Sequence, residues 1–137
     1  MSQHFILYPS FLMMFLTLFL YGKNYFDNVK AAKNKSVKSD YFKAYKGDVP
    51  EYIHVSRQTL KNQFELPILF YFLTAIIFSY NQIKIADIVF SWLFVISRYL
   101  HCYVRLTSNY IPYRAKIFQF GLFILIFWCI YFISICN

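Results

Sequence analysis

The chain has 137 residues, of which 59% are hydrophobic and 23% aromatic, and its formal net charge is +8. A soluble domain of this size could not bury so much apolar surface, so the composition excludes an ordinary soluble globular protein. The positive charge does not indicate nucleic-acid binding either, because the basic residues gather between apolar runs and form no repeat with base-stacking aromatics. The sequence instead predicts a single all-α domain, residues 1–137, embedded in a lipid bilayer.

The first apolar run predicts a membrane-spanning helix over residues 5–21. A span needs roughly 20 mainly apolar residues, and Pro9 falls in the first turns, where a proline does least harm. A secretory signal peptide would begin with basic residues and end at a small-residue cleavage site. Only His4 precedes the run as an ionisable residue, and no such cleavage site follows it, so we expect a retained helix.

Residues 22–55 form a polar and strongly basic segment. We interpret it as a loop, which is either flexible or continues the first helix over the membrane surface. Basic residues are in excess on the cytoplasmic side of membrane proteins, so this loop is expected to be cytoplasmic, with both termini and the next short turn outside. The basic residues of the segment, together with one at the start of the following helix, are Lys23, Lys30, Lys33, Lys35, Lys38, Lys43, Lys46 and Arg57.

Three further apolar helices are predicted, over residues 56–80, 85–107 and 114–135. Pro67 lies inside the first of these, where a proline kinks the helix or frees a carbonyl group. The connections between these helices are short, which favours antiparallel neighbours. The predicted fold is therefore an integral membrane bundle of four antiparallel helices.

Polar side chains interrupt the second helix close to its cytoplasmic end. A charged group at depth costs roughly 2.5–3.5 kcal/mol on membrane-insertion scales, so such groups are expected to face the bundle interior. Helical spacing places Gln58, Asn62 and Glu65 on one face, with Arg57 and Lys61 on an adjoining face. These side chains are candidates for a buried polar cluster.

The third helix carries a matching set. Arg98, His101 and Arg105 follow one another at steps of three and four residues, so they share one face. Counted from the cytoplasmic ends of their helices, Glu65 and Arg98 lie at about the same depth. We therefore expect an ion pair between Glu65 and Arg98, with Asn62 and His101 nearer the surface.

Two interpretations of this polar cluster are open. In one, the cluster only pins the second and third helices together, although the net stabilisation from a single buried ion pair is doubtful. In the other, the surplus of cations, including Arg114 at the start of the fourth helix, forms a site for an anionic ligand that carries carboxylates.

No pattern indicates a metal site or a familiar catalytic motif. The three cysteines lie in or at the ends of apolar helices without metal-ligand spacing, and we interpret them as small packing residues. There is no Ser-His-Asp order and no glycine-rich phosphate loop. We expect no metal.

The two polar helices also resemble the signatures of the MAPEG family, the membrane-associated proteins in eicosanoid and glutathione metabolism. The run from Asn62 through Glu65 to Pro67 is similar to the Asn-x-x-Glu-x-x-Pro-type signature of the family. The run from Arg98 to Arg114 looks like its second signature. The resemblance extends over most of the chain and is closest to small bacterial members that lack an assigned reaction.

The resemblance implies a four-helix bundle that assembles as a homotrimer, here in the bacterial inner membrane. It also implies that glutathione, as co-substrate, binds between adjacent subunits near the cytosolic side. By position, Asn62 and Glu65 match ligand-binding residues of the family, and Arg98 matches its third-helix arginine. The second-helix arginine of the family is expected where this chain has Gln58, and Arg57 is one position away.

The chain departs from the glutathione transferases of the family in having His101 and Arg105 where they have tyrosines. In an enzyme, Arg105 or Arg114 would lower the pKa of the bound thiol and raise its thiolate fraction, and His101 would donate a proton. Asn109 would help to bind the ligand. The function implied is then conjugation or reduction of lipophilic substrates by glutathione or a similar anionic thiol.

Whether the chain is an enzyme, of the glutathione transferase or peroxidase type, is left open by the sequence. The alternative is a non-catalytic membrane scaffold, or a trimer that binds an anionic lipid headgroup through the same arginines. Basic pockets between helices on the cytoplasmic side suit such headgroups.

Overall fold

The computed structural model describes residues 3–136, and most of them are helical. Four helical stretches are long and apolar enough to cross a bilayer, which agrees with the predicted all-α class and number of spans. The elements are a 3-10 helix, Gln3–Ile6, followed by α1 Leu7–Lys33, α2 Tyr41–Ala44, α3 Glu51–Lys61, a 3-10 turn Asn62–Phe64, α4 Leu66–Tyr80, α5 Ile85–Leu106 and α6 Ile111–Cys136.

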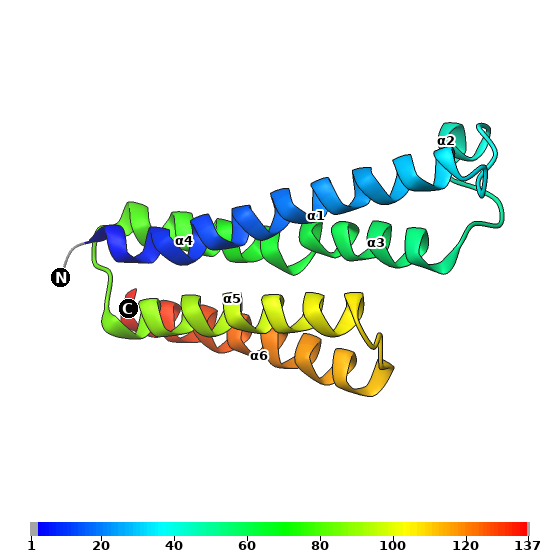
Figure 1. The fold of residues 1–137 in the computed structure, drawn as a ribbon. Helices are drawn as coiled ribbons and strands as arrows, with labels where there is room; N and C mark the ends of the chain where they lie inside the picture. The colour runs from blue at the N-terminus through cyan, green and yellow to red at the C-terminus, as the bar shows by residue number, and fades with distance from the viewer. Residues whose placement is uncertain (1–2, 137) are drawn as a thin grey trace.

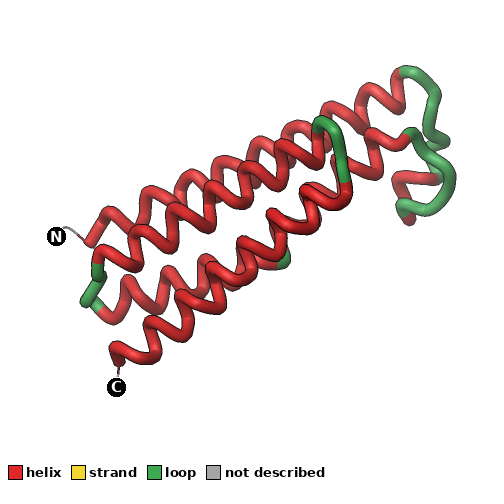
Figure 2. Tube along the Cα trace, turned by 90° about the horizontal axis from the view of Figure 1, so that it is seen from below, coloured by secondary structure: helices red, strands yellow, loops and turns green. Residues whose placement is uncertain are grey.

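The long helices run antiparallel in chain order and form a bundle of two pairs (Figure 1). α1 lies along α3 and α4, whereas α5 lies along α6. The connection between α4 and α5 lies at the same end of the bundle as the N- and C-terminal ends of the chain (Figure 2). The segment that holds α2 and the turn between α5 and α6 lie toward the opposite end, where α1 and α3 project beyond the other two helices (Figure 1).

Large apolar side chains fill the centre of the bundle. Phe70 of α4 stacks on Phe94 of α5 with ring centroids 4.8 Å apart, and Trp128 of α6 lies 6.1 Å from Phe70. All three side chains are fully buried. Many other large apolar side chains lie exposed on the outer faces of the helices, which is expected where a helix contacts lipid instead of water.

α1 does not end near residue 21 but continues along its axis to Lys33, so of the two interpretations of the basic segment the structure favours a continuation of the first helix. The extension is hydrophilic, so a run of apolar residues could not reveal it. An ion pair four residues apart, Lys23 with Asp27 at 2.7 Å, supports the start of the extension. The loop itself is therefore shorter at both ends than residues 22–55, because α3 also begins earlier than expected, at Glu51.

A small apolar cluster outside the main core holds this extension in place. We call it the outer cluster; its buried members are Ala31 at the end of α1, Val37, Tyr41 in α2 and Ile53 in α3. These four residues come from α1, the loop that follows it, α2 and α3. The outer cluster thus orders a basic segment that composition alone would suggest is a solvated loop.

The predicted helix over residues 56–80 is broken in two. After α3 the chain makes the 3-10 turn Asn62–Phe64, and α4 begins after Glu65, which has the non-helical torsions φ −106° and ψ −104°. Pro67 explains the break, because in a continuous helix its ring would clash with the carbonyl group four residues earlier. The expected disturbance at Pro67 is confirmed, and it is larger than a kink.

The last two helices differ from their predicted bounds by a few residues. α5 ends at Leu106 instead of 107, and α6 covers Ile111–Cys136 instead of residues 114–135. The earlier start of α6 includes Pro112 in its first turn. A proline is tolerated there because the first N–H groups of a helix have no partner within it.

Candidate functional site

The polar side chains of α5 lie on the face that packs inside the bundle. Arg98, His101 and Arg105 are 1%, 2% and 8% exposed, so the expectation that they share one face is confirmed. Cys102 lies on the same face and is 3% exposed. The second half of α5 thus carries two guanidinium groups, an imidazole and a thiol into the protein interior.

Arg98 is a buried charge without an ion-pair partner in residues 3–136. None of its three guanidinium nitrogens has a hydrogen-bond partner, and all three are buried. The guanidinium group lies over the ring of Phe118 on α6, 5.4 Å from its centroid. A desolvated cation–π contact is worth about 2 kcal/mol, which is less than the several kcal/mol that burial of an ion costs. Arg98 therefore retains unused N–H groups that could donate hydrogen bonds to an anion.

The expected ion pair between Glu65 and Arg98 is absent from the described part of the chain. Its ion pairs are Lys23–Asp27 and Lys43–Asp40, both in the basic segment. Glu65 is exposed and interacts with the α5 arginines only through longer-range electrostatic attraction. This prediction was wrong because it assumed an unbroken second helix.

The 3-10 turn accounts for the error. A 3-10 helix advances about 120° per residue and an α-helix about 100°, so three residues shift the helical face by about 60°. Gln63 is 2% exposed as a result, and Glu65 lies outside. The Nε2 atom of Gln63 donates a hydrogen bond to Sγ of Cys102 (3.3 Å), whereas its Oε1 atom has no partner. Sequence reasoning missed Gln63, although Pro67 signalled that the face would change.

The two other arginines of this region already have amide partners. Nη2 of Arg105 donates to Oε1 of Gln58 (2.5 Å), and Nη1 of Arg114 donates to Oδ1 of Asn109 (2.7 Å). Both guanidinium groups also act electrostatically on the buried imidazole of His101. The end of α5 and the start of α6 thus bring together five of the predicted site residues: Arg98, His101, Arg105, Asn109 and Arg114.

The remaining predicted ligand-binding residues lie apart from this group. The guanidinium group of Arg57 stacks over the ring of Tyr45, 3.7 Å from its centroid, a partner that the sequence did not suggest. Asn62 is half-buried in the 3-10 turn. Within residues 3–136, no hydrogen bond or ion pair joins Arg57, Asn62 or Glu65 to an arginine of α5.

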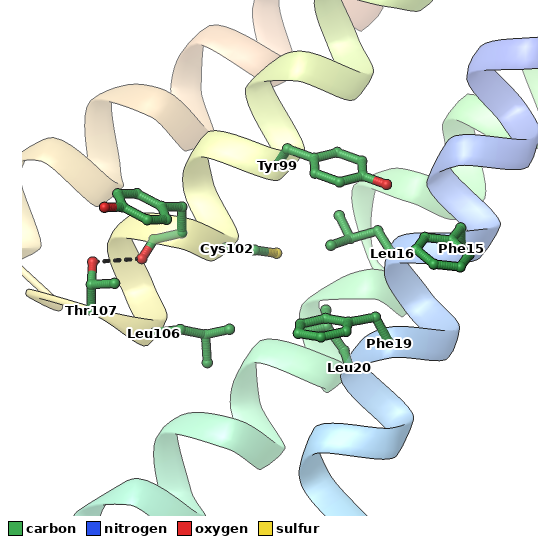
Figure 3. A pocket seen from close by; sticks show the side chains of 9 residues that line it. Phe15, Leu16, Phe19, Leu20, Tyr99, Cys102, Leu106 and Thr107 are labelled. Atoms are coloured by element: carbon green, nitrogen blue, oxygen red, sulfur yellow. Dashed lines mark hydrogen bonds between the residues drawn. The ribbon is translucent and has the colours of Figure 1, made fainter.

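Two cavities border the α5 cluster. A polar cavity of about 310 Å³ is lined by groups of both signs, among them Arg105 and Glu51. An apolar cavity of about 390 Å³ lies between α1 and α5, and Cys102 is part of its wall (Figure 3). Leu106 and Thr107 line both cavities, so the polar and apolar spaces are neighbours along α5.

The end of α5 and the start of α6 together form a positively charged region. Among the described residues, no three His, Cys, Asp or Glu side chains gather closely enough to hold a metal ion. Guanidinium groups shielded from water bind carboxylates strongly, and positive charge of this kind also stabilises a thiolate. The geometry thus suits an anionic ligand.

Comparison with known protein families identifies the proteins to which this chain is related. The model of the MAPEG family matches residues 6–134, a stretch that runs from the last residue of the first 3-10 helix into the last turn of α6. Neither the curated proteins nor the solved structures contain a significant match. Because the family match includes both polar runs and nearly the whole chain, this protein belongs to the MAPEG family.

Proposed function

We propose that this membrane protein binds glutathione, or a similar small anionic thiol, at the cationic region formed by α5 and the start of α6. The buried guanidinium group of Arg98, with three nitrogens that lack hydrogen-bond partners in the described chain, is the observation that supports this most directly. A buried charge left alone is strongly unfavourable, and an anion that accepts its hydrogen bonds removes most of that penalty. The association of the MAPEG family with glutathione favours a thiol tripeptide among the anions that would fit.

In this proposal the bound thiol conjugates or reduces lipophilic substrates that arrive from the bilayer. Arg98 binds a carboxylate of the tripeptide, and Arg105 or Arg114 stabilises the thiolate, which is the reactive form. His101 donates a proton to the product. Asn109 holds Arg114 in position through their 2.7 Å hydrogen bond.

The proposal includes a homotrimer in the bacterial inner membrane, with the basic end of the bundle in the cytoplasm. The concentration of lysines at that end supports the orientation. Within one chain, Arg57, Asn62 and Glu65 form no hydrogen bond or ion pair with the α5 arginines among residues 3–136, and this supports assembly. A neighbouring subunit would allow Arg57, Asn62 and Glu65 of one copy to meet the α5 arginines of another at a shared ligand.

A second candidate function is a non-catalytic trimer that binds an anionic lipid headgroup. The observation that favours it is that Arg105 and Arg114 already donate to the amide oxygens of Gln58 and Asn109. Arginines held in this way can position a phosphate without activating a thiol. The polar cavity beside Arg105 offers room for such a group.

Calorimetric titration of glutathione into the purified protein in detergent tests the proposal. Saturable binding is expected, with thiolate absorbance rising in the same sample. Arg98→Gln should abolish binding, whereas Lys46→Gln, which removes an exposed charge from the basic segment, should leave it unchanged. Arg98→Gln is expected to fold, because it removes an unpaired buried charge.

Absence of heat at millimolar glutathione would contradict the thiol-binding proposal. The same titration with vesicles that contain an anionic phospholipid would then identify a headgroup site, provided that Arg98→Gln also weakens that binding.

A further inference from the structure

The polar cavity of about 310 Å³ lies where α1, α3 and the end of α5 meet, and its wall carries charges of both signs. Lys23 of α1 and Arg105 of α5 supply the positive charges. Glu51, at the start of α3, supplies the negative charge. The remaining polar side chains of the wall are Tyr52, Thr107, Ser108 and Asn109.

The opposite charges in this wall do not neutralise each other. Lys23 pairs instead with Asp27 (2.7 Å), which lies outside the cavity wall. Glu51 forms no ion pair with any residue in the range 3–136. Arg105 is 8% exposed, and its Nε atom is buried without a hydrogen-bond partner in that same range. The cavity therefore presents an unused buried donor and, separately, an unpaired carboxylate.

The two unpaired groups lie at different depths. Arg105 donates to Gln58 of α3, and Glu51 precedes Gln58 by seven residues on the same helix. Seven residues make about two turns, so Glu51 lies about 10 Å farther along α3, toward the end where α1 and α3 project. Glu51 is also exposed. A ligand of this cavity would thus place an anionic group against Arg105 and a cationic group farther out, near water.

The apolar cavity between α1 and α5 adjoins this polar cavity on the side of the membrane-spanning core. Leu106 and Thr107 line both cavities. Figure 3 shows Leu106 of α5 and Phe19 of α1 facing each other across the gap. Phe15 and Phe19 are exposed on the outer face of the bundle, so the apolar cavity lies directly beneath the lipid-facing surface. A molecule in the bilayer can therefore reach the polar cavity with its tail still among apolar side chains.

We propose that the two adjoining cavities bind one molecule of phosphatidylethanolamine, whose headgroup carries an anionic phosphate and a primary ammonium group. Arg105 and Lys23 donate hydrogen bonds to the phosphate, and Glu51 accepts one from the ammonium. An acyl chain fills the apolar cavity. The depth agrees with this assignment, because the apolar run of α1 ends at Tyr21 and the charged wall begins two residues later.

This lipid site goes beyond the proposed thiol-binding function. The thiol proposal rests on the buried guanidinium group of Arg98, which does not line the polar cavity. The lipid site depends on Glu51 and Arg105, and it needs neither glutathione nor a second subunit.

The wall favours ethanolamine over two other common phospholipid headgroups. An anionic headgroup without an ammonium, such as phosphatidylglycerol, would leave Glu51 unpaired and beside further negative charge. The choline group has no N–H to donate to Glu51, and proteins recognise it with cages of aromatic rings. Tyr52 is the single aromatic residue among the described residues of this wall, and its ring already lies 5.7 Å from Nζ of Lys30.

Native mass spectrometry of the delipidated full chain in detergent, without glutathione, tests the proposal. Phosphatidylethanolamine, phosphatidylglycerol and phosphatidylcholine with identical palmitoyl and oleoyl chains are titrated separately. We expect phosphatidylethanolamine to have a dissociation constant about fivefold lower than the other two, the upper end of what an ion pair beside water contributes. Equal affinities would overturn the proposal. Tighter binding of phosphatidylglycerol would also overturn it, and would support the anionic-headgroup candidate instead.

A matched pair of variants tests the role of the carboxylate. Glu51→Gln should abolish the preference for phosphatidylethanolamine, and circular dichroism should show unchanged helix content because the side chain is exposed. Asp48→Asn removes the same charge from an exposed residue outside the cavity wall, and it should keep the preference. Retention of the preference in Glu51→Gln, or equal loss in both variants, would refute recognition of the ammonium by Glu51.

Two further comparisons test whether the ligand is a lipid. O-Phosphoethanolamine has the charges of the headgroup without acyl chains, and at millimolar concentration it should not displace the lipid. Displacement would show that the polar cavity takes a soluble ligand and would overturn the lipid assignment. Phe19→Trp should weaken phosphatidylethanolamine binding by narrowing the apolar cavity, whereas Leu18→Trp, at an exposed residue outside its wall, should not. Equal effects of both tryptophans would refute occupation of the apolar cavity by the acyl chain.

Discussion

Asp87 and Arg98 are charged residues on the same buried face of α5, but their surroundings satisfy them very differently. Asp87 is fully buried, and its carboxylate accepts hydrogen bonds from Nε1 of Trp128 and from the backbone N–H of Lys84, each at 2.9 Å. Arg98 is buried to nearly the same extent and has no hydrogen-bond partner for its guanidinium group within the described residues. A satisfied group of this kind has a structural role, whereas the unsatisfied guanidinium group is the observation on which the proposed ligand binding rests.

Asp87→Ala is predicted to lower the free energy of unfolding by about 2–4 kcal/mol, because hydrogen bonds to a charged group are strong and the Trp128 donor would be left buried. Unfolding of the detergent-solubilised protein by dodecyl sulfate, followed by circular dichroism, measures this. Asp40→Ala is the control: its carboxylate pairs with Lys43 on the surface, where such pairs contribute little. Equal effects of the two substitutions would contradict a structural role for Asp87.

At the scale of elements, the close packing of α5 on α6 depends on one glycine. A Cβ atom added at Gly121 would lie 2.8 Å from Oγ of Ser97, closer than such contacts allow. That hydroxyl group is not free to turn away without loss, because it donates to the carbonyl oxygen of Phe94 (2.6 Å). The small residue at position 121 therefore sets how closely the two helices approach.

Gly121→Ala is predicted to destabilise the wild-type protein but to stabilise the Ser97→Ala variant by about 0.5–1 kcal/mol, the helix-propensity gain of alanine over glycine. Gly22→Ala should give the same gain in either background, because nothing lies within 4 Å of the added atom. A double-mutant cycle on dodecyl sulfate unfolding measures the coupling. Additive effects of Gly121→Ala and Ser97→Ala would show that the two residues do not collide.

The sequence anticipated the elements well where the physical cause was local. The four spans follow from the lengths of the apolar runs, and the buried face of α5 follows from the spacing of Arg98, His101 and Arg105. The position of Glu65 could not be read in this way, because the 3-10 turn before Pro67 changes which residues face inward. The hydrogen bond from Gln63 to Cys102 could not be read from the sequence either, since a thiol in an apolar helix looks like any small packing residue.

For the molecule as a whole, the main difference from expectation is the projecting end formed by α1, α2 and α3. Its order depends on the outer cluster, which includes residues as far apart in the sequence as Ala31 and Ile53. No local propensity reveals such contacts, so the hydrophilic residues 22–33 could be read equally well as loop or helix. The bundle and the projecting end have separate apolar clusters, and this predicts that they can lose order separately.

Tyr41→Ala is predicted to loosen the projecting end without unfolding the membrane-spanning bundle. Tyr41 is 4% exposed within the outer cluster, and truncation of a large buried side chain costs several kcal/mol, on the order of 3–5 kcal/mol for an aromatic. Brief trypsin treatment should then cut faster after Lys38 and Lys43. Phe26→Ala, at an exposed ring of α1 outside the outer cluster, is the control. Loss of the bundle's own protease resistance in Tyr41→Ala would show that the two parts unfold together.

The unbroken course of α1 has a mechanical consequence. Its 27 residues make a rod of about 40 Å, and one rod carries both Ala31 of the outer cluster and the Phe15–Leu20 wall of the apolar cavity. Between these points there is no proline and no break to absorb a displacement. A force that tilts the projecting end is therefore transmitted along the helix to the cavity wall, where Leu16 and Leu20 also contact the main core. The width of the apolar cavity beside Cys102 therefore depends on the position of the projecting end, which lies outside the main apolar core.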